Sequence, residues 1–482
     1  MAPFDLIETT IADVHAAMAA GDTSARALVD RYRDRIAAYD DAVNAVLTLN
    51  DDAPARARAL DAARERDGPV GPLHGVPLVV KDNHDTHDMP TTAGATALAD
   101  ARPARDATVV ERLRGAGAVI VGKTNLQELS FGVDTISSLG GATRNAYDRD
   151  RRPSGSSGGT AVAVAANLAL AGTGTDTCSS VRSPPAFANC VGVRPTRGLV
   201  SRTGLVPLSE TQDTAGPIAR TVPDAARLLD AMAGYDSADP VTARGVGRAP
   251  ADGYAAGLDD GDAAAALDGA RLGVVRAAFG LNDPANGDRA AAAAVTDVVE
   301  DALAAMAAAG ATVVDPVEVV DRDRLESARV VTHEFARDLD RYLATLEDPP
   351  HDSLAAILET GTVAPAVAER IAAAGVLDVD AGSLETNADY LRRLRRREQL
   401  REAVLARLAD ERLDALVYPP STIPPVERPA HQPFGELNCA LAAHTGLPSL
   451  VVPAGFTDDG LPVGVELLGR AFAEPRLLAL GA

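Results

Sequence analysis

Apolar and polar residues alternate along the chain in patterns that predict helices followed by short buried strands. Residues 9–38 carry Ala, Val and Leu at helical spacing, with Arg and Asp between them, which predicts helices. The stretch "GPLHGVPLVVKDN" predicts a turn and then a buried strand with Lys81 at its C-terminal end. "DATVVERLRGAGAVIVGKTN" predicts a helix closed at a glycine and a strand over 118–121, with Lys123 just past it. This alternation favours an α/β fold with a largely parallel sheet.

The same alternation continues toward the C-terminus. "TAVAVAANLALAGTG" is small and apolar on all sides, which is typical of a helix buried against a sheet. A strand, a helix and a strand are predicted for "ARLGVVR", "DRAAAAAVTDVVEDALAAMAAAG" and "ATVVDPVEVV". Residues 384–410 predict a long helix, and we interpret its basic run as a solvated face. Late strands are predicted for "RLDALVYPP", "LPSLVVPAGF" and "LPVGVELLG".

Composition narrows the class of protein. The chain has 482 residues, 46% of them hydrophobic, which is ample for a globular core. Its formal charge of −22 argues against a nucleic-acid partner, since that affinity rests on clustered basic residues. The acidic residues are scattered, Ala is abundant and Lys is almost absent, so we expect the high-salt cytoplasm of a halophile. "MAPFDLIETT" has no signal-peptide pattern, and no apolar run approaches the ~20 residues of a membrane span, so we expect a cytoplasmic protein without a membrane partner.

The cysteines and histidines of the sequence indicate neither a disulfide framework nor a metal site. The three cysteines, Cys178, Cys190 and Cys439, are too few and too scattered to predict a disulfide framework. His84 and His87 form an H-x-x-H pair, but no third metal ligand stands beside them, so we interpret this segment as a solvated loop. We therefore expect neither a metal nor a cofactor.

Lysine usage is more informative. Lys81 and Lys123 are the only lysines among 46 basic residues. One explanation for a retained lysine is that the site needs a buried amine that can lose its proton, because arginine cannot do so. Two leftover lysines are the other explanation.

Two serine-rich turns flank the small apolar segment. "SGSSGGT" surrounds Ser156 and "TCSSVR" surrounds Ser180. Glycine and serine in this density are typical of a flexible linker, yet the first turn leads directly into a predicted buried element. No histidine lies near either turn in the sequence. A lysine kept neutral by burial can act as the base for a serine instead.

These segments together resemble the amidase signature family. The resemblance is carried by "GSSGGT", "GTDTCSSVR", "GVPLVVKDN", "TTAGA", "GKTN" and "GLPSLVVPAGFTDDGLPVGVELLGR", and it covers about 5–235 and 385–472. It implies a single domain over 1–482, with a catalytic core at about 60–235, a variable middle at about 236–410 and returning strands at about 411–482. The fold it implies is a large, mixed, mostly parallel twisted sheet covered by helices on both faces.

The resemblance also implies a catalytic triad. Ser180 would be the nucleophile, Ser156 would relay its proton, and Lys81 would be the base, with the Gly155–Ser156 peptide in the cis form. Backbone N–H groups from Thr177 to Ser180 would form the oxyanion hole. Ser130, Thr177, Cys178 and Ser179 are expected to contact the substrate, and Lys123, Asp176 and Arg182 are expected to support the site from behind.

One departure from the family pattern concerns the nucleophile loop. Cys178 and Ser179 stand where the family has two glycines, and a side chain there is strained if the backbone φ is positive. The expected function is a stand-alone amidase acting on a small-molecule amide. Its alternatives are the A subunit of glutamyl-tRNA(Gln) amidotransferase and a catalytically impaired, ligand-binding relative. Leu129, Ser130 and Phe131 are expected at the acyl pocket, and a homodimer is left open.

Overall fold

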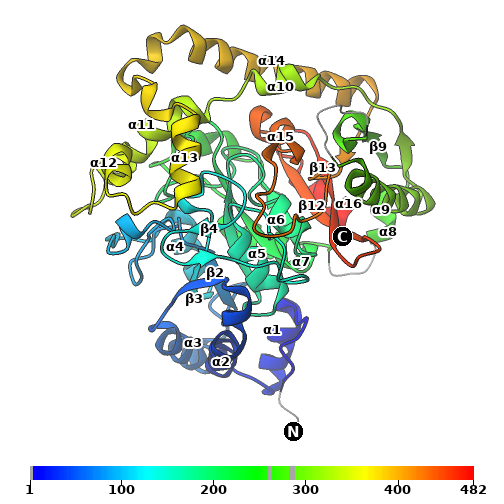
Figure 1. The fold of residues 1–482 in the computed structure, drawn as a ribbon. Coiled ribbons are helices and arrows are strands. Elements are labelled where there is room, and N and C mark those ends of the chain that lie inside the picture. The colour runs from blue at the N-terminus through cyan, green and yellow to red at the C-terminus, as the bar shows by residue number, and fades with distance from the viewer. Residues whose placement is uncertain (1–3, 259–262, 282–287) are drawn as a thin grey trace.

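The computed structural model describes residues 4–258, 263–281 and 288–482. Within these residues, eleven strands form one sheet in the order β1-β3-β2-β6-β8-β7-β12-β13-β11-β9-β10 (Figure 1), and β4 and β5 form a separate hairpin. The strands are β1 Val46–Leu49, β2 Pro77–Lys81, β3 Val119–Thr124, β4 Ile136–Ser137, β5 Gly141–Ala142, β6 Ala171–Asp176, β7 Val191–Arg194, β8 Thr214–Ala219, β9 Arg271–Val274, β10 Thr312–Val314, β11 Ala415–Tyr418, β12 Ser449–Phe456 and β13 Pro462–Leu468.

The sheet is mixed, as expected, but it is not mostly parallel. Among the described strands, four neighbouring pairs are parallel and six are antiparallel. The parallel pairs lie in β3-β2-β6 and in β11-β9-β10, where long crossovers join the strands. Antiparallel pairs make up the centre. For β12 and β13 the cause is a short connecting turn, which permits only antiparallel pairing.

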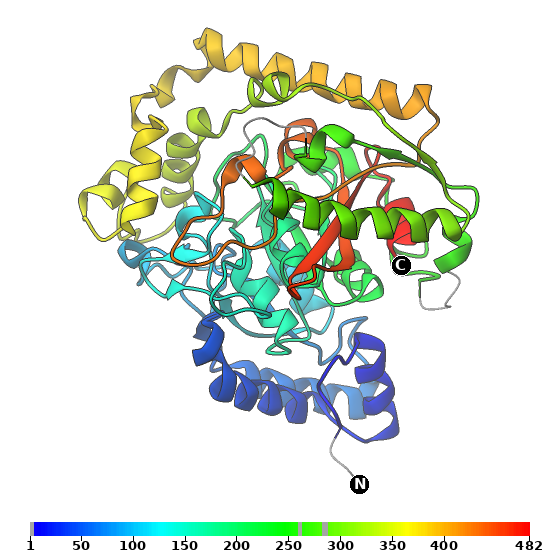
Figure 2. The ribbon, with the colours of Figure 1, turned by 45° about the vertical axis from the view of Figure 1, so that its right-hand side comes forward.

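Helices cover both faces of the sheet. On β8, Ile218 joins the cluster of Ala161 and Val164 from α5, whereas the neighbouring Ala219 joins the main core that contains Leu228 of α7. Figure 2 brings α9 to the front, where it packs on β12 and β13. The helices are α1 Ile11–Ala20, α2 Ala25–Val43, α3 Ala53–Asp67, α4 Thr108–Gly115, α5 Gly158–Ala165, α6 Ser183–Ala186, α7 Val222–Met232, α8 Ala263–Leu267, α9 Arg289–Ala308, α10 Arg322–Glu326, α11 Val331–Leu343, α12 Leu354–Glu359, α13 Pro365–Ala373, α14 Ala388–Asp410, α15 Ala440–Thr445 and α16 Glu474–Gly481.

Two predicted boundaries differ from the structure. The segment interpreted as one helix over 160–174 divides into α5 and β6, because Asn167 takes a left-handed φ of 55° that ends the helix. Lys123 lies inside β3 and not just past its end. The other predicted strands are present, and among the described helices none is long and apolar enough to cross a membrane. The division of the chain into core, middle and returning strands stays a prediction.

Candidate active site

Lys81 is the last residue of β2, and its amine lies inside the protein. The side chain is fully buried, with Nζ 2.7 Å from Ser156 Oγ and 2.8 Å from Thr175 Oγ1. Burial lowers the pKa of Lys81 to about 7, although Asp213 and Asp176 act in the opposite direction. A large share of the amine is therefore neutral near pH 7, and its lone pair can accept the Ser156 hydroxyl proton while an N–H donates to Thr175.

The turn around Ser156 brings the second serine to this amine. The Gly155–Ser156 peptide is cis, as the resemblance implies, and the Ser156 N–H donates to Ser180 Oγ at 2.8 Å. The glycines of this turn do not supply positive φ angles. They permit close approach instead, since a Cβ on Gly159 would lie 2.2 Å from the Asn125 carbonyl oxygen. Lys81, Ser156 and Ser180 thus form one connected group.

The loop that carries Ser180 presents backbone donors without acceptors. Throughout the described chain, no group accepts a hydrogen bond from the backbone N–H of Cys178, Ser179 or Ser180. Buried N–H groups are almost always paired, so three open donors beside the Ser180 hydroxyl are available to a ligand. Cys178 and Ser179 have no positive φ, so the strain considered for these two side chains is absent.

Buried charged side chains stabilise the loop that carries Ser180. The Asp176 carboxylate pairs with Arg182 at 3.1 Å and Arg194 at 2.5 Å, and it accepts the Val181 N–H at 3.0 Å. Burial alone would raise the pKa of Asp176, but the two guanidinium groups outweigh it and the pKa is lowered. Arg182 also pairs with Glu466 of β13 at 2.8 Å. These contacts fix the loop to the centre of the sheet.

Lys123 is separate from the serines. It is fully buried and forms an ion pair with Asp82 at 3.0 Å, and it donates to the Pro90 carbonyl oxygen and Thr91 Oγ1 at 3.0 and 2.9 Å. Its contacts therefore hold the segment after β2 in place, and its supporting role at the site stays a prediction.

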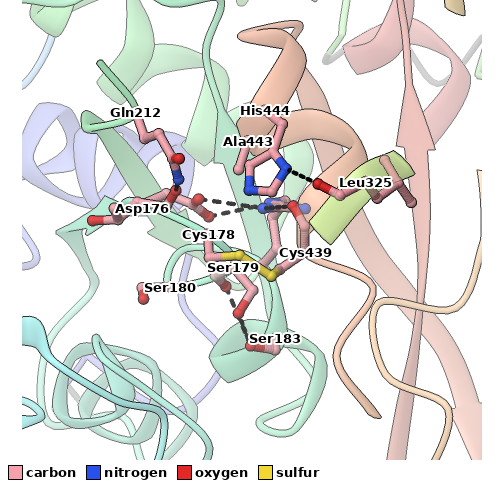
Figure 3. Close-up of a disulfide and its surroundings, with 12 residues drawn as sticks. Asp176, Cys178, Ser179, Ser180, Ser183, Gln212, Leu325, Cys439, Ala443 and His444 are labelled. Atoms are coloured by element: carbon pink, nitrogen blue, oxygen red, sulfur yellow. Dashed lines mark hydrogen bonds and ion pairs between the residues drawn. A yellow bond between two sulfur atoms is a disulfide. The ribbon is translucent and has the colours of Figure 1, made fainter. Parts of the chain in front are cut away.

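A disulfide joins Cys178 to Cys439, which we did not predict (Figure 3). The two residues are 261 positions apart, so their spacing gave no reason to pair them. The bond attaches the nucleophile loop to the start of α15, where the Cys439 carbonyl oxygen also accepts from Arg182 at 3.2 Å. Cys178 therefore has no free thiol to act as a nucleophile, and Cys190 is buried and free.

A cavity of about 440 Å³ opens at Ser180. Of the predicted contact residues, Ser130, Thr177 and Cys178 line it, whereas Ser179 does not. Ser130 Oγ is buried without a hydrogen-bond partner, which leaves it for a ligand. Phe131 lines the cavity as expected, but Leu129 does not. The remaining apolar walls come from Val133, Leu208, Val331, Ala374, Phe434, Cys439 and Ala440.

The charged residues in the described lining of this cavity are Glu326, Arg329 and Arg370. Arg329 lies over the Phe434 ring, 4.6 Å from its centroid, and within the described chain no carboxylate is at ion-pair distance from its guanidinium. Arg370 pairs with Asp134 at 3.4 Å. His444 donates from Nδ1 to the Leu325 carbonyl oxygen, and burial lowers its pKa to about 3, so it is neutral.

The two histidines of the H-x-x-H pair lie in different surroundings. His84 is fully buried, not solvated, and burial lowers its pKa to about 3. His87 lies beside Asp88 and Asp106, but both carboxylates pair with Arg114, at 2.7 and 3.0 Å. The Arg114 guanidinium therefore already neutralises both carboxylates.

Three further residues of the site were missed. Thr175 Oγ1 accepts from both Lys81 and Asn83, and Gln212 Nε2 donates to the Thr177 carbonyl oxygen at 2.9 Å. The segments "GTGTD" and "KDN" contain the first two next to predicted residues, which was the available signal. Gln212 had no local signal, because it comes from the loop before β8.

Comparison with known proteins shows the family of this chain. Residues 27–478 match the family model described as amidase. The chain belongs to the amidase signature family. Among curated relatives of this amidase, the A subunit of glutamyl-tRNA(Gln) amidotransferase from Halorhodospira halophila is 36% identical over 491 residues, covering 98% of this chain and 96% of the relative. Its counterpart from Symbiobacterium thermophilum is 37% identical over 481 residues, with 96% and 93% covered.

Solved structures give a second measure of similarity. Native peptide amidase from Stenotrophomonas maltophilia superposes on this amidase with a TM-score of 0.88 at 39% identity, covering 99% of this chain and 96% of that one. The A subunit of glutamyl-tRNA(Gln) amidotransferase from Thermotoga maritima gives a TM-score of 0.75 at 27% identity, with 99% and 94% covered. The α/β fold with its large mixed sheet and helices on both faces is therefore shared with enzymes that act on C–N bonds.

Proposed function

We propose that this protein is a stand-alone amidase that hydrolyses a terminal carboxamide to a carboxylic acid and ammonia. Ser180 Oγ attacks the amide carbonyl carbon, while its proton passes to Ser156 Oγ and the Ser156 proton passes to neutral Lys81. The oxyanion is held by the N–H groups of Cys178, Ser179 and Ser180, each of which is typically worth ~3–4 kcal/mol in the transition state. A lysine base replaces the histidine of other serine hydrolases.

The rest of the reaction restores Lys81, Ser156 and Ser180 to their starting protonation states. The tetrahedral intermediate collapses as the C–N bond breaks, and the Lys81 ammonium returns a proton through Ser156 to the leaving nitrogen, which departs as ammonia. Water then attacks the acyl group on Ser180, and its proton takes the same route to Lys81. Collapse of that intermediate releases the acid and restores the Ser180 hydroxyl, so the net reaction is amide plus water to acid plus ammonia.

One observation carries this proposal. A buried amine with a lowered pKa, a hydroxyl in contact with it, and a second hydroxyl beside open backbone N–H groups lie in one connected group at a cavity. This arrangement argues against the impaired-relative interpretation, because the loop with Cys178 and Ser179 keeps unstrained backbone and open donors.

The substrate class follows from the cavity and the structural neighbours. We infer that the acyl part is peptide-like, because Arg329 and Ser130 offer unpartnered donors that suit peptide carbonyl oxygens, beside apolar walls. The higher TM-score and identity to peptide amidase than to the Thermotoga maritima protein support the stand-alone branch. The close sequence similarity to curated amidotransferase subunits favours the alternative, in which the ammonia goes to a partner protein.

The test compares two substrates with the purified chain. A dipeptide carrying a terminal carboxamide and free glutamine are each incubated with wild type and with Ser180→Ala, and ammonia is measured. The proposal predicts turnover of the dipeptide amide by the chain alone and none by Ser180→Ala. Turnover of glutamine alone, and only after two further subunits are added, would support the amidotransferase alternative.

A further inference from the structure

A second large cavity lies against α14, the long helix that crosses the top of the molecule in Figure 1. Its volume is about 640 Å³, and its lining shares no residue with the described lining of the Ser180 cavity. Among the residues that the structure describes, six arginines line it, although the chain as a whole carries a charge of −22. They come from three distant parts of the chain: Arg197, Arg244, Arg248, Arg395, Arg397 and Arg401.

These positive charges are poorly neutralised by the protein. In the described lining, Glu398 is the one carboxylate, and it pairs with Arg401 at 3.2 Å. Arg397 is only 4% exposed, yet its guanidinium donates to neutral acceptors, Gln212 Oε1 at 2.7 Å and the Ala443 carbonyl oxygen at 3.0 Å. Arg197 Nε is buried without a hydrogen-bond partner. Arg244 and Arg395 are exposed, and no described carboxylate lies at ion-pair distance from either.

Burial and the crowding of like charges both lower the pKa of the buried arginines in this cavity. Burial lowers the pKa of Arg197 to about 10 and that of Arg397 to about 9, and neighbouring arginines act in the same direction. Glu334 opposes this effect for both, but its carboxylate accepts from the hydroxyls of Ser209, Thr211 and Tyr390 rather than from these arginines. A cluster of cations is costly to keep together unless an anion joins it.

We propose that this cavity binds a small anion with several negative charges, of the oligophosphate class. The planar, multiple N–H donors of arginine match the oxygens of such groups, and six arginine side chains of the described chain line one cavity here. The strong overall negative charge disfavours a long nucleic-acid backbone, so the occupant is a small molecule.

The basic run of α14 therefore has two roles. Arg392 and Arg393 pair with Asp389 on the outer part of the helix, as a solvated face does. Arg395, Arg397 and Arg401 turn toward the cavity, which corrects our interpretation of the whole run as a solvated face.

Inorganic pyrophosphate is the probe for this site. Its binding to the full chain is measured by isothermal titration calorimetry at about 0.1 M KCl, where surface charges are screened beyond ~10 Å. The cavity variant Arg244→Ala/Arg395→Ala removes two exposed arginines, and Arg392→Ala/Arg407→Ala is the control with the same change in charge outside the cavity. Single Arg395→Glu is a second cavity variant, and circular dichroism checks that each protein is folded.

We expect wild type and the control pair to bind pyrophosphate with similar Kd. Both cavity variants should bind at least about tenfold more weakly, since charge-assisted contacts are each worth about this factor. No binding to wild type, or equal weakening by the cavity and control pairs, would overturn the proposal.

Discussion

The pH dependence of catalysis is the prediction that follows most directly from the position of Lys81. Only the neutral amine can accept the Ser156 proton, so activity should fall as pH falls through the pKa of Lys81. Burial lowers this pKa from 10.5 to about 7, and the difference corresponds to about 5 kcal/mol in favour of the neutral form. About half of the molecules have a neutral amine at pH 7 but only ~1 in 100 at pH 5, so kcat/KM should drop about 50-fold between these two pH values.

The assay is ammonia release from the dipeptide amide between pH 5 and 9. Two carboxyl groups also titrate near neutrality, because burial raises the pKa of Asp85 and of Asp338 to about 7. In the variants Asp85→Asn and Asp338→Asn, kcat/KM should still fall as the pH drops below about 7. Buried His84 and His444, with pKa values of about 3, stay neutral over the whole range. Lys81→Arg should lose activity at every pH, because a guanidinium stays charged.

Two results would refute this reasoning. A wild-type profile that stays flat down to pH 5 would mean that no group with a pKa near 7 has to be deprotonated. An acidic limb that disappears in Asp85→Asn or Asp338→Asn would assign the titration to that carboxyl and not to Lys81.

Three other variants test the surroundings of the site. Cys439→Ala should lower the free energy of unfolding by about 2–4 kcal/mol in urea titrations, more than Cys190→Ala does, because only the first opens the disulfide; equal losses would argue against the bond. Asp176→Asn should lower the free energy of unfolding by about 3–5 kcal/mol, because buried Arg194 loses its carboxylate partner and Arg182 keeps only Glu466. Asp389→Asn at the exposed α14 pairs should lower it by no more than ~1 kcal/mol. Arg329→Leu should raise KM for the dipeptide amide about tenfold with kcat unchanged, and a fall in kcat at constant KM would contradict a binding role.

Strands that depend only on neighbouring residues could be predicted from local sequence patterns. The strands at β2, β3, β11, β12 and β13 were visible because short apolar runs between turns are local signals. The scarcity of lysine pointed to Lys81 and Lys123 alike, and the resemblance to the amidase signature family then selected Lys81 together with Ser156 and Ser180. The three proposed catalytic residues then lie in one group in the structure.

Features assembled from distant segments could not be predicted in this way. The order of strands sets how many pairs are antiparallel, and that order depends on packing across the whole chain. Cys178 and Cys439 meet because α15 returns to the nucleophile loop, 261 residues later. The arginine cavity joins side chains from positions 197, 244–248 and 395–401, so no single stretch of sequence contained it. The role of the glycines near Ser156 required the approach of Asn125, which only the folded chain reveals.

Covalent labelling of the nucleophile tests the central claim most directly. The protein is incubated with a fluorophosphonate, which reacts with activated serines, and the labelled peptide is identified by mass spectrometry for wild type and for Lys81→Ala. The account predicts a label on Ser180 in wild type and its loss in a folded Lys81→Ala variant. A label on another residue, equal labelling of both proteins, or no label on folded wild type would contradict a Ser180 nucleophile activated through Ser156 by Lys81.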